Sequence, residues 1–169
     1  LGGKSGRRRD EALPSGDKVA FLYATFPQPT ETFLRRELRV ILEKGGDVTP
    51  FSLWKGADWF EERSVNRFRL GELWTLVYWL PYWLVRRPGA FREVLGELLE
   101  FPCRSFQNWC ETFLGLGFGL VRALHLRREG YVFCHAPWAT MPATAALVVR
   151  ELVGIEFSMG AHAYDVFRH

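Results

Sequence analysis

A histidine and an aspartate stand three residues apart near the end of the 169-residue chain, at His162 and Asp165. The run 155–159 before them alternates apolar and polar side chains, which predicts a strand, and Gly154 suits the end of a preceding helix. Open α/β sheets bind ligands in the loops past the carboxyl ends of their strands. There the imidazole can reach a sugar hydroxyl or a phosphate. The alternative is a histidine that only hydrogen-bonds its own loop.

A second group of polar side chains, Thr30, Glu31 and Thr32, lines the turn between a predicted strand and a predicted helix. The apolar run 19–24 is typical of a strand buried on both faces of a parallel sheet, and apolar residues recur at helical spacing over 33–42. We expect Thr30 to be the N-cap and Glu31 to lie in the first helical turn. The helix start can hold an anion, but the missing GxGxxG run disfavours a dinucleotide dehydrogenase.

The elements that position these residues form two similar strand-helix-strand units. The first unit ends in a predicted strand at 47–53. The second runs from a strand ending at His135, through a helix whose first turn contains Pro142, to the strand at 155–159. The pattern predicts an α/β fold with a Rossmann-like parallel sheet flanked by helices.

The alternation of strands and helices is interrupted at residues 55–128 by a long insertion that is rich in Trp and Arg and is predicted to be helical. Its most apolar part, 73–85, is shorter than the roughly 20 residues that span a bilayer, and Pro81 breaks it. Trp, Tyr, Leu and Arg together are typical of a helix that lies on an anionic membrane. Helices packed into the core, with tryptophans filling volume, are the alternative.

Three glycines, Gly115, Gly117 and Gly119, lie within a predicted helix at 108–128. They follow no strand, so they indicate close helix packing rather than a phosphate-binding loop.

The composition excludes several classes of protein. Apolar content of 48% and charged content of 24% are ordinary for a globular domain, which we place at 19–169 after a flexible leader at 1–18. A net charge of +3 does not by itself argue for nucleic acid. Three cysteines without CxxC spacing favour neither disulfides nor zinc, so a reduced, cytoplasmic location is expected. A metal site through His135, His162 and His169 lacks ligand spacing, and no metal is predicted.

Three sequence blocks point to one family. They are FPQPTETFLRREL with GGDVTPFSL, HAPWATMPATAALVVRELVGIEFS, and AHAYDVF. They resemble the FP-x-x-(S/T)-ETF, HAHFA-x-x-PA and AHA-x-D-I-F runs in the amino-terminal domain of family 4 glycosyltransferases of the GT-B fold, in the bacterial branch that builds exopolysaccharide, capsule or lipopolysaccharide. Pro137 departs from the second histidine of HAHF, and Gly160 departs from a common threonine.

This resemblance implies a retaining transfer of a sugar from a nucleotide-sugar donor to a glycan or lipid-linked acceptor, without a further cofactor. It implies that His162 contacts the donor sugar and that Asp165 fixes this loop. The turn 30–32 would face the donor diphosphate or the acceptor, and His135 would lie near the acceptor.

The resemblance also implies a carboxyl-terminal donor domain that this sequence does not contain, so we expect the chain alone to be inactive. The expected location is cytoplasmic, with an anionic membrane surface at the inner face of the cell membrane as a candidate partner. The competing hypothesis is a non-catalytic Rossmann-like module that binds a membrane surface or a ligand.

Overall fold

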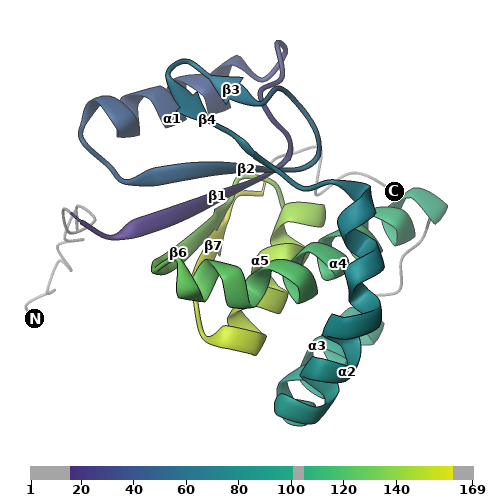
Figure 1. Ribbon diagram of the computed structural model, residues 1–169. Coiled ribbons are helices and arrows are strands. Elements are labelled where there is room, and N and C mark those ends of the chain that lie inside the picture. Colours follow the sequence, from purple (N-terminus) through teal and green to yellow (C-terminus); the bar gives the residue numbers. More distant parts are fainter. Residues whose placement is uncertain (1–15, 101–104, 162–169) are drawn as a thin grey trace, which may run out of the picture.

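A five-stranded, all-parallel sheet forms the centre of the computed structural model, which describes residues 16–100 and 105–161 (Figure 1). The strand order is β5-β2-β1-β6-β7. The bounds are β1 (Lys18–Thr25), β2 (Val48–Lys55), β5 (Asn66–Arg67), β6 (Tyr131–Ala136) and β7 (Glu156–Met159). From β1 the chain adds β2 and then β5 on one side. It then returns to place β6 beside β1 and adds β7 on the other side. The predicted Rossmann-like α/β fold is therefore confirmed.

Helices cover both faces of the sheet, and β1 is buried between them (Figure 1). On one face, Phe21 and Tyr23 of β1 pack with Leu34 and Leu38 of α1 (Thr32–Glu43). On the other face, the intervening side chains of β1 join the core formed by α4 (Phe106–Arg128) and α5 (Met141–Val153). This two-sided burial accounts for the continuous apolar run in the sequence of β1.

Close contact between α4 and α5 depends on glycine. A Cβ added at Gly115 would lie 2.5 Å from the carbonyl oxygen of Met141, and one added at Gly119 would lie 2.5 Å from Cβ of Val148. Gly117 faces the other way, toward Leu73. The prediction that these glycines serve helix packing is confirmed. α5 also begins and ends as predicted, with a proline in its first turn and a left-handed residue, Gly154, after its last.

The segment 55–128 begins with extended structure rather than with a helix. A short hairpin, β3 (Trp59–Phe60) and β4 (Arg63–Ser64), precedes β5. Strands of two residues carry no readable periodicity, so the sequence did not indicate them. The helical part consists of the 3₁₀ helix η1 (Leu70–Thr75), α2 (Leu76–Arg86), α3 (Pro88–Glu100) and α4. Among the described residues, no helix is both long and apolar enough to cross a membrane.

The predicted start of α1 was wrong by one to two residues. Thr30 was expected to cap the helix, but Glu31 occupies the cap position, no side chain caps the amides, and the helix starts at Thr32. The amide of Glu31 donates to the carbonyl of Gln28 at 3.3 Å. Because this turn places Thr30 ahead of the cap position, its hydroxyl does not cap the helix.

Candidate functional site

The strand order reverses between β1 and β6, and the loops after these two strands frame the candidate site. In sheets of this type, the chain leaves the two strands in opposite directions, which opens a crevice at their carboxyl ends. The loop 26–31 follows β1 and the loop 137–140 follows β6. The rings of Phe33 and Trp138 meet edge to face, with centroids 6.0 Å apart, and so join the two sides.

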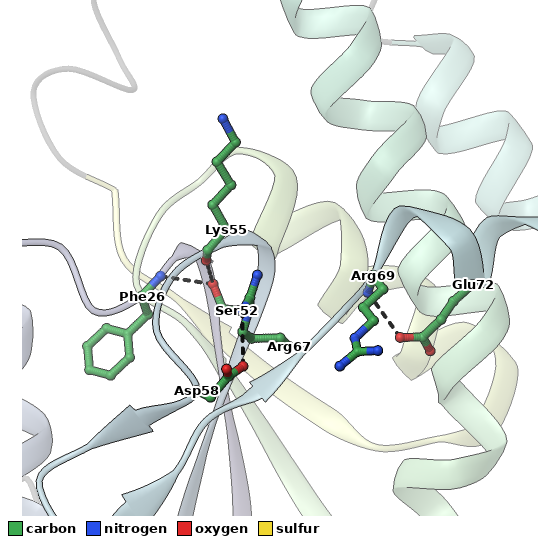
Figure 2. Close-up of polar contacts among 7 residues, drawn as sticks. All are labelled: Phe26, Ser52, Lys55, Asp58, Arg67, Arg69 and Glu72. Atoms are coloured by element: carbon green, nitrogen blue, oxygen red, sulfur yellow. Dashed lines mark hydrogen bonds and ion pairs between the residues drawn. The ribbon is translucent and has the colours of Figure 1, made fainter.

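The loop after β1 is anchored to the end of β2 (Figure 2). The hydroxyl of Ser52, which is fully buried, accepts a hydrogen bond of 2.9 Å from the amide of Phe26 and donates to the carbonyl of Lys55. Gly56 packs directly on Phe26, where an added Cβ would lie 1.8 Å from the Phe26 carbonyl oxygen. The φ angle of Gly56, 135°, also excludes ordinary side chains. The position of the loop is thus set by the neighbouring strand.

A neighbouring polar pair fixes the segment that follows. Arg67 of β5 binds Asp58 at 3.0 Å, and Figure 2 shows this pair beside Ser52. Farther along the chain, the amide of Arg69 donates to the carboxylate of Glu72 at 3.0 Å and opens η1. These contacts lead the chain from the sheet edge into the helical segment.

His135 lies on β6 and faces the side of the sheet that α1 covers. Its ring centroid is 4.7 Å from that of Phe21, and its Nδ1 shares a hydrogen bond of 2.7 Å with the hydroxyl of Ser158 on β7. Burial lowers the pKa of His135, and the negative charge of Glu37 opposes this only in part. The imidazole is therefore neutral at neutral pH, and no described residue hydrogen-bonds its Nε2.

Tyr23 and two glutamates belong to the same region. The Tyr23 hydroxyl is buried and makes no hydrogen bond within the described chain. Burial raises the pKa of Tyr23, and the charges of Glu37 and Glu31 raise it further. Burial also raises the pKa of Glu31. The phenol consequently stays protonated and can donate, while the two carboxylates accept.

This combination suits a neutral ligand that is rich in hydroxyl groups. Carboxylates and a neutral imidazole exchange hydrogen bonds with hydroxyls, and an aromatic ring such as that of Trp138 packs against an apolar face. The charges of Glu31 and Glu37 repel an anion, so a diphosphate would be disfavoured beside them. The exposed side chains of Thr30 and Thr32 flank Glu31 on the rim.

A separate hollow of about 510 Å³ runs along α1, and it is basic. Two of its three arginines already have partners: Arg39 binds Glu61 at 2.6 Å, and the guanidinium of Arg35 lies 5.8 Å from the ring centre of Phe60. The hollow is lined by α1 alone. We place the candidate site at the strand ends instead, because two loops and two strands converge there.

Two residues of the predicted site lie at the same edge of the sheet. Glu31 and His135 lie at the carboxyl edge of the sheet, as the sequence predicted. His162 and Asp165 lie outside the described residues. Ser158 was not identified from the sequence, although the register of two parallel strands pairs it with His135.

The two positions that depart from the glycosyltransferase pattern pack against each other. The amide of Gly160 donates to the carbonyl of Ala136 at 2.8 Å. A Cβ at Gly160 would lie 2.7 Å from the carbonyl oxygen of Pro137. A threonine at 160 would therefore collide with the backbone of the loop after β6.

Within the described ranges, no three His, Cys, Asp or Glu side chains are grouped so that they can hold a metal ion. Comparison of the chain with protein-family models, with curated proteins and with solved structures found no match.

Proposed function

We propose that this chain is the amino-terminal, acceptor-side half of a retaining glycosyltransferase. The enzyme moves a sugar from a nucleotide-sugar to a glycan or lipid-linked acceptor in cell-surface polysaccharide synthesis. The supporting observation is the group of side chains that can hydrogen-bond hydroxyls, Glu31, Glu37 and His135, at the switch point, where the order of the parallel strands reverses. The three sequence blocks that resemble family 4 glycosyltransferases support the same proposal.

The acceptor sits at the carboxyl ends of β1 and β6 in this proposal. Nε2 of the neutral His135 accepts a hydrogen bond from one acceptor hydroxyl, and Ser158 holds the ring through Nδ1. Glu31 and Glu37 accept from other hydroxyls. The donor diphosphate lies away from these carboxylates, toward a second domain that supplies cationic groups. His162 contacts the donor sugar, and Asp165 fixes its loop.

Sugar transfer by the full-length protein of this reading frame tests the proposal. Purified protein is incubated with a panel of UDP- and GDP-sugars and membrane lipid extract, and release of the nucleoside diphosphate is measured. We expect His162→Ala to reduce turnover by roughly two orders of magnitude, the scale of losing one transition-state contact. The exposed His125→Ala is the matched control and should leave turnover unchanged.

A second variant separates the acceptor role from donor contact. Glu31→Gln should raise the KM for the acceptor by roughly tenfold or more, because it removes a charge-assisted hydrogen bond, and should leave the KM for the donor unchanged. Glu43→Gln, at the far end of α1, is its control. An unaltered acceptor KM in Glu31→Gln would remove the assignment of the acceptor to this edge.

A non-catalytic module is the second candidate function. The observation that favours it is a solvent-exposed apolar face on α2, which suits docking and requires no catalysis. If the full-length protein transfers no sugar yet sediments with membranes, this candidate replaces the first.

A further inference from the structure

The helix α2 is apolar around its whole circumference, but only one side of it is packed. Trp83 is 2% exposed, and its indole nitrogen donates to the carbonyl of Leu120 on α4 at 2.8 Å. Trp79 stacks beside Trp83, with ring centroids 6.4 Å apart, and packs against the core. On this inner side, two of the tryptophans therefore fill core volume, which was the alternative to membrane contact.

The outer side of α2, continued by Trp74 at the end of η1, carries an exposed apolar ridge. Trp74 is 82% exposed, Val77 78%, Tyr78 62% and Val85 80%. Spacings of three, four and seven residues put these four side chains on one face, and Pro81 lies exposed between them. We call these four residues the α2 ridge. An exposed apolar helix face of this kind marks an interaction site.

Arginines border the α2 ridge, and the acidic residues of the helical segment lie on either side of it, at Glu72 before the ridge and at Glu93, Glu97 and Glu100 on α3 after it. Residues 73–92 contain three arginines, Arg86, Arg87 and Arg92, and no Asp or Glu. All three arginines are exposed, and none forms an ion pair with a residue in the described ranges. Just ahead of the ridge, the charge of Glu72 is neutralised by Arg122 at 2.5 Å.

The position of α2 makes the ridge accessible to a broad surface. Figure 1 shows α2 and α3 projecting from the body of the molecule, away from the sheet. With 11 residues, α2 is shorter than the roughly 20 that cross a bilayer. It has the chemistry of a helix that lies in the headgroup region, with aromatic rings at the boundary and arginines toward the phosphates.

We propose that the α2 ridge docks the protein on an anionic lipid membrane, with Trp74, Val77, Tyr78 and Val85 entering the headgroup boundary and Arg86 and Arg87 binding lipid phosphates. Charge complementarity selects this occupant over a second copy of the chain. Pairing two ridges would also bring their unpaired arginines into a shared interface, where like charges oppose association.

Vesicle co-sedimentation of the purified chain tests the docking. One set of vesicles contains phosphatidylcholine alone, and the other contains phosphatidylcholine with phosphatidylglycerol. We expect binding to the anionic vesicles, weakening as salt is raised from low to physiological concentration. Each arginine near an anionic surface adds to the free energy of binding. Losing two of them in Arg86→Gln/Arg87→Gln should weaken binding by roughly 30-fold. Arg63→Gln/Arg128→Gln, which removes two other exposed arginines, should have little effect.

The apolar part of the proposal needs its own variants. Trp74→Ser/Val77→Ser should abolish binding at physiological salt, whereas Trp59→Ser, an exposed tryptophan on β3, should not. Circular dichroism checks that each variant is folded. The docking is overturned if the anionic vesicles do not bind the chain, if the ridge variants bind normally, or if ultracentrifugation without lipid shows a dimer that Trp74→Ser/Val77→Ser dissociates. None of these outcomes depends on sugar transfer.

Discussion

His135 couples the candidate site to the stability of the domain. Burial holds its pKa below the ordinary value of 6.5, so between these two pKa values the unfolded chain binds more protons than the folded chain. The free energy of unfolding therefore rises with pH across this window and falls as the pH drops below about 6.5. We expect the wild type to lose more stability than His135→Gln between about pH 7.5 and about pH 5.

Urea unfolding at several pH values measures this difference. The control variant for removing a histidine is His125→Gln, at an exposed position on α4. Parallel pH profiles for wild type and His135→Gln would show that burial of the imidazole contributes nothing.

Individual site residues were only partly predictable from the sequence. Glu31 and His135 stand at the ends of readable elements, so their positions at one edge followed from the βα pattern. Ser158 and Tyr23 did not stand out, because a serine in an edge strand and a tyrosine in an apolar run are common. Their relevance arises from cross-strand register and from burial, neither of which a single sequence determines.

Whole elements were predictable where their periodicity was long. The apolar run of β1 and the helical spacing of α1 and α5 identified these elements within a few residues. β3, β4 and β5, each two residues long, left no pattern to read. The sequence did not decide whether the Trp-rich segment packs in the core or lies on the surface, because its side chains are apolar on every side. Only the packing shows that Trp83 is buried and that Trp74 is exposed.

Glycine on α4 has a packing role that a matched pair of variants can measure. Gly119→Ala places a Cβ 2.5 Å from the side chain of Val148, which forces α4 and α5 apart. We expect a loss of roughly 1–3 kcal/mol in the free energy of unfolding, as for other overpacked cores. Gly96→Ala on α3 meets no atom within 4 Å, and there we expect a gain of up to about 1 kcal/mol from helix propensity.

Denaturant unfolding followed by circular dichroism gives both values. The opposite signs are the essential result, because both changes add the same methyl group to a helix. If Gly119→Ala stabilised the domain as Gly96→Ala does, the contact between α4 and α5 would have to be looser than the structure describes.

Taken as a whole, the molecule offers two surfaces with different charge. Acidic and hydroxyl-binding groups, including Glu31 and Glu37, lie at the switch point, while arginines border the α2 ridge. A lipid-linked acceptor presents both chemistries at once, with sugar hydroxyls joined to a lipid at an anionic membrane. The proposed transfer and the proposed docking are thus compatible, although each rests on separate observations.

The acidic character of the switch point leads to a prediction about the isolated chain. Cleavage of a glycosyl-phosphate bond leaves a diphosphate whose developing charge needs fixed cations or dipoles. Glu31 and Glu37 are negatively charged and repel the developing charge of the diphosphate, so this edge alone cannot stabilise that leaving group. We expect residues 1–169 alone to transfer no sugar, and we expect co-expression with the donor domain of the same reading frame to restore transfer. Release of nucleoside diphosphate, measured with and without that domain, checks this. Turnover by residues 1–169 alone would mean that the leaving group is stabilised within this chain, and the proposed division of labour between two domains would fail.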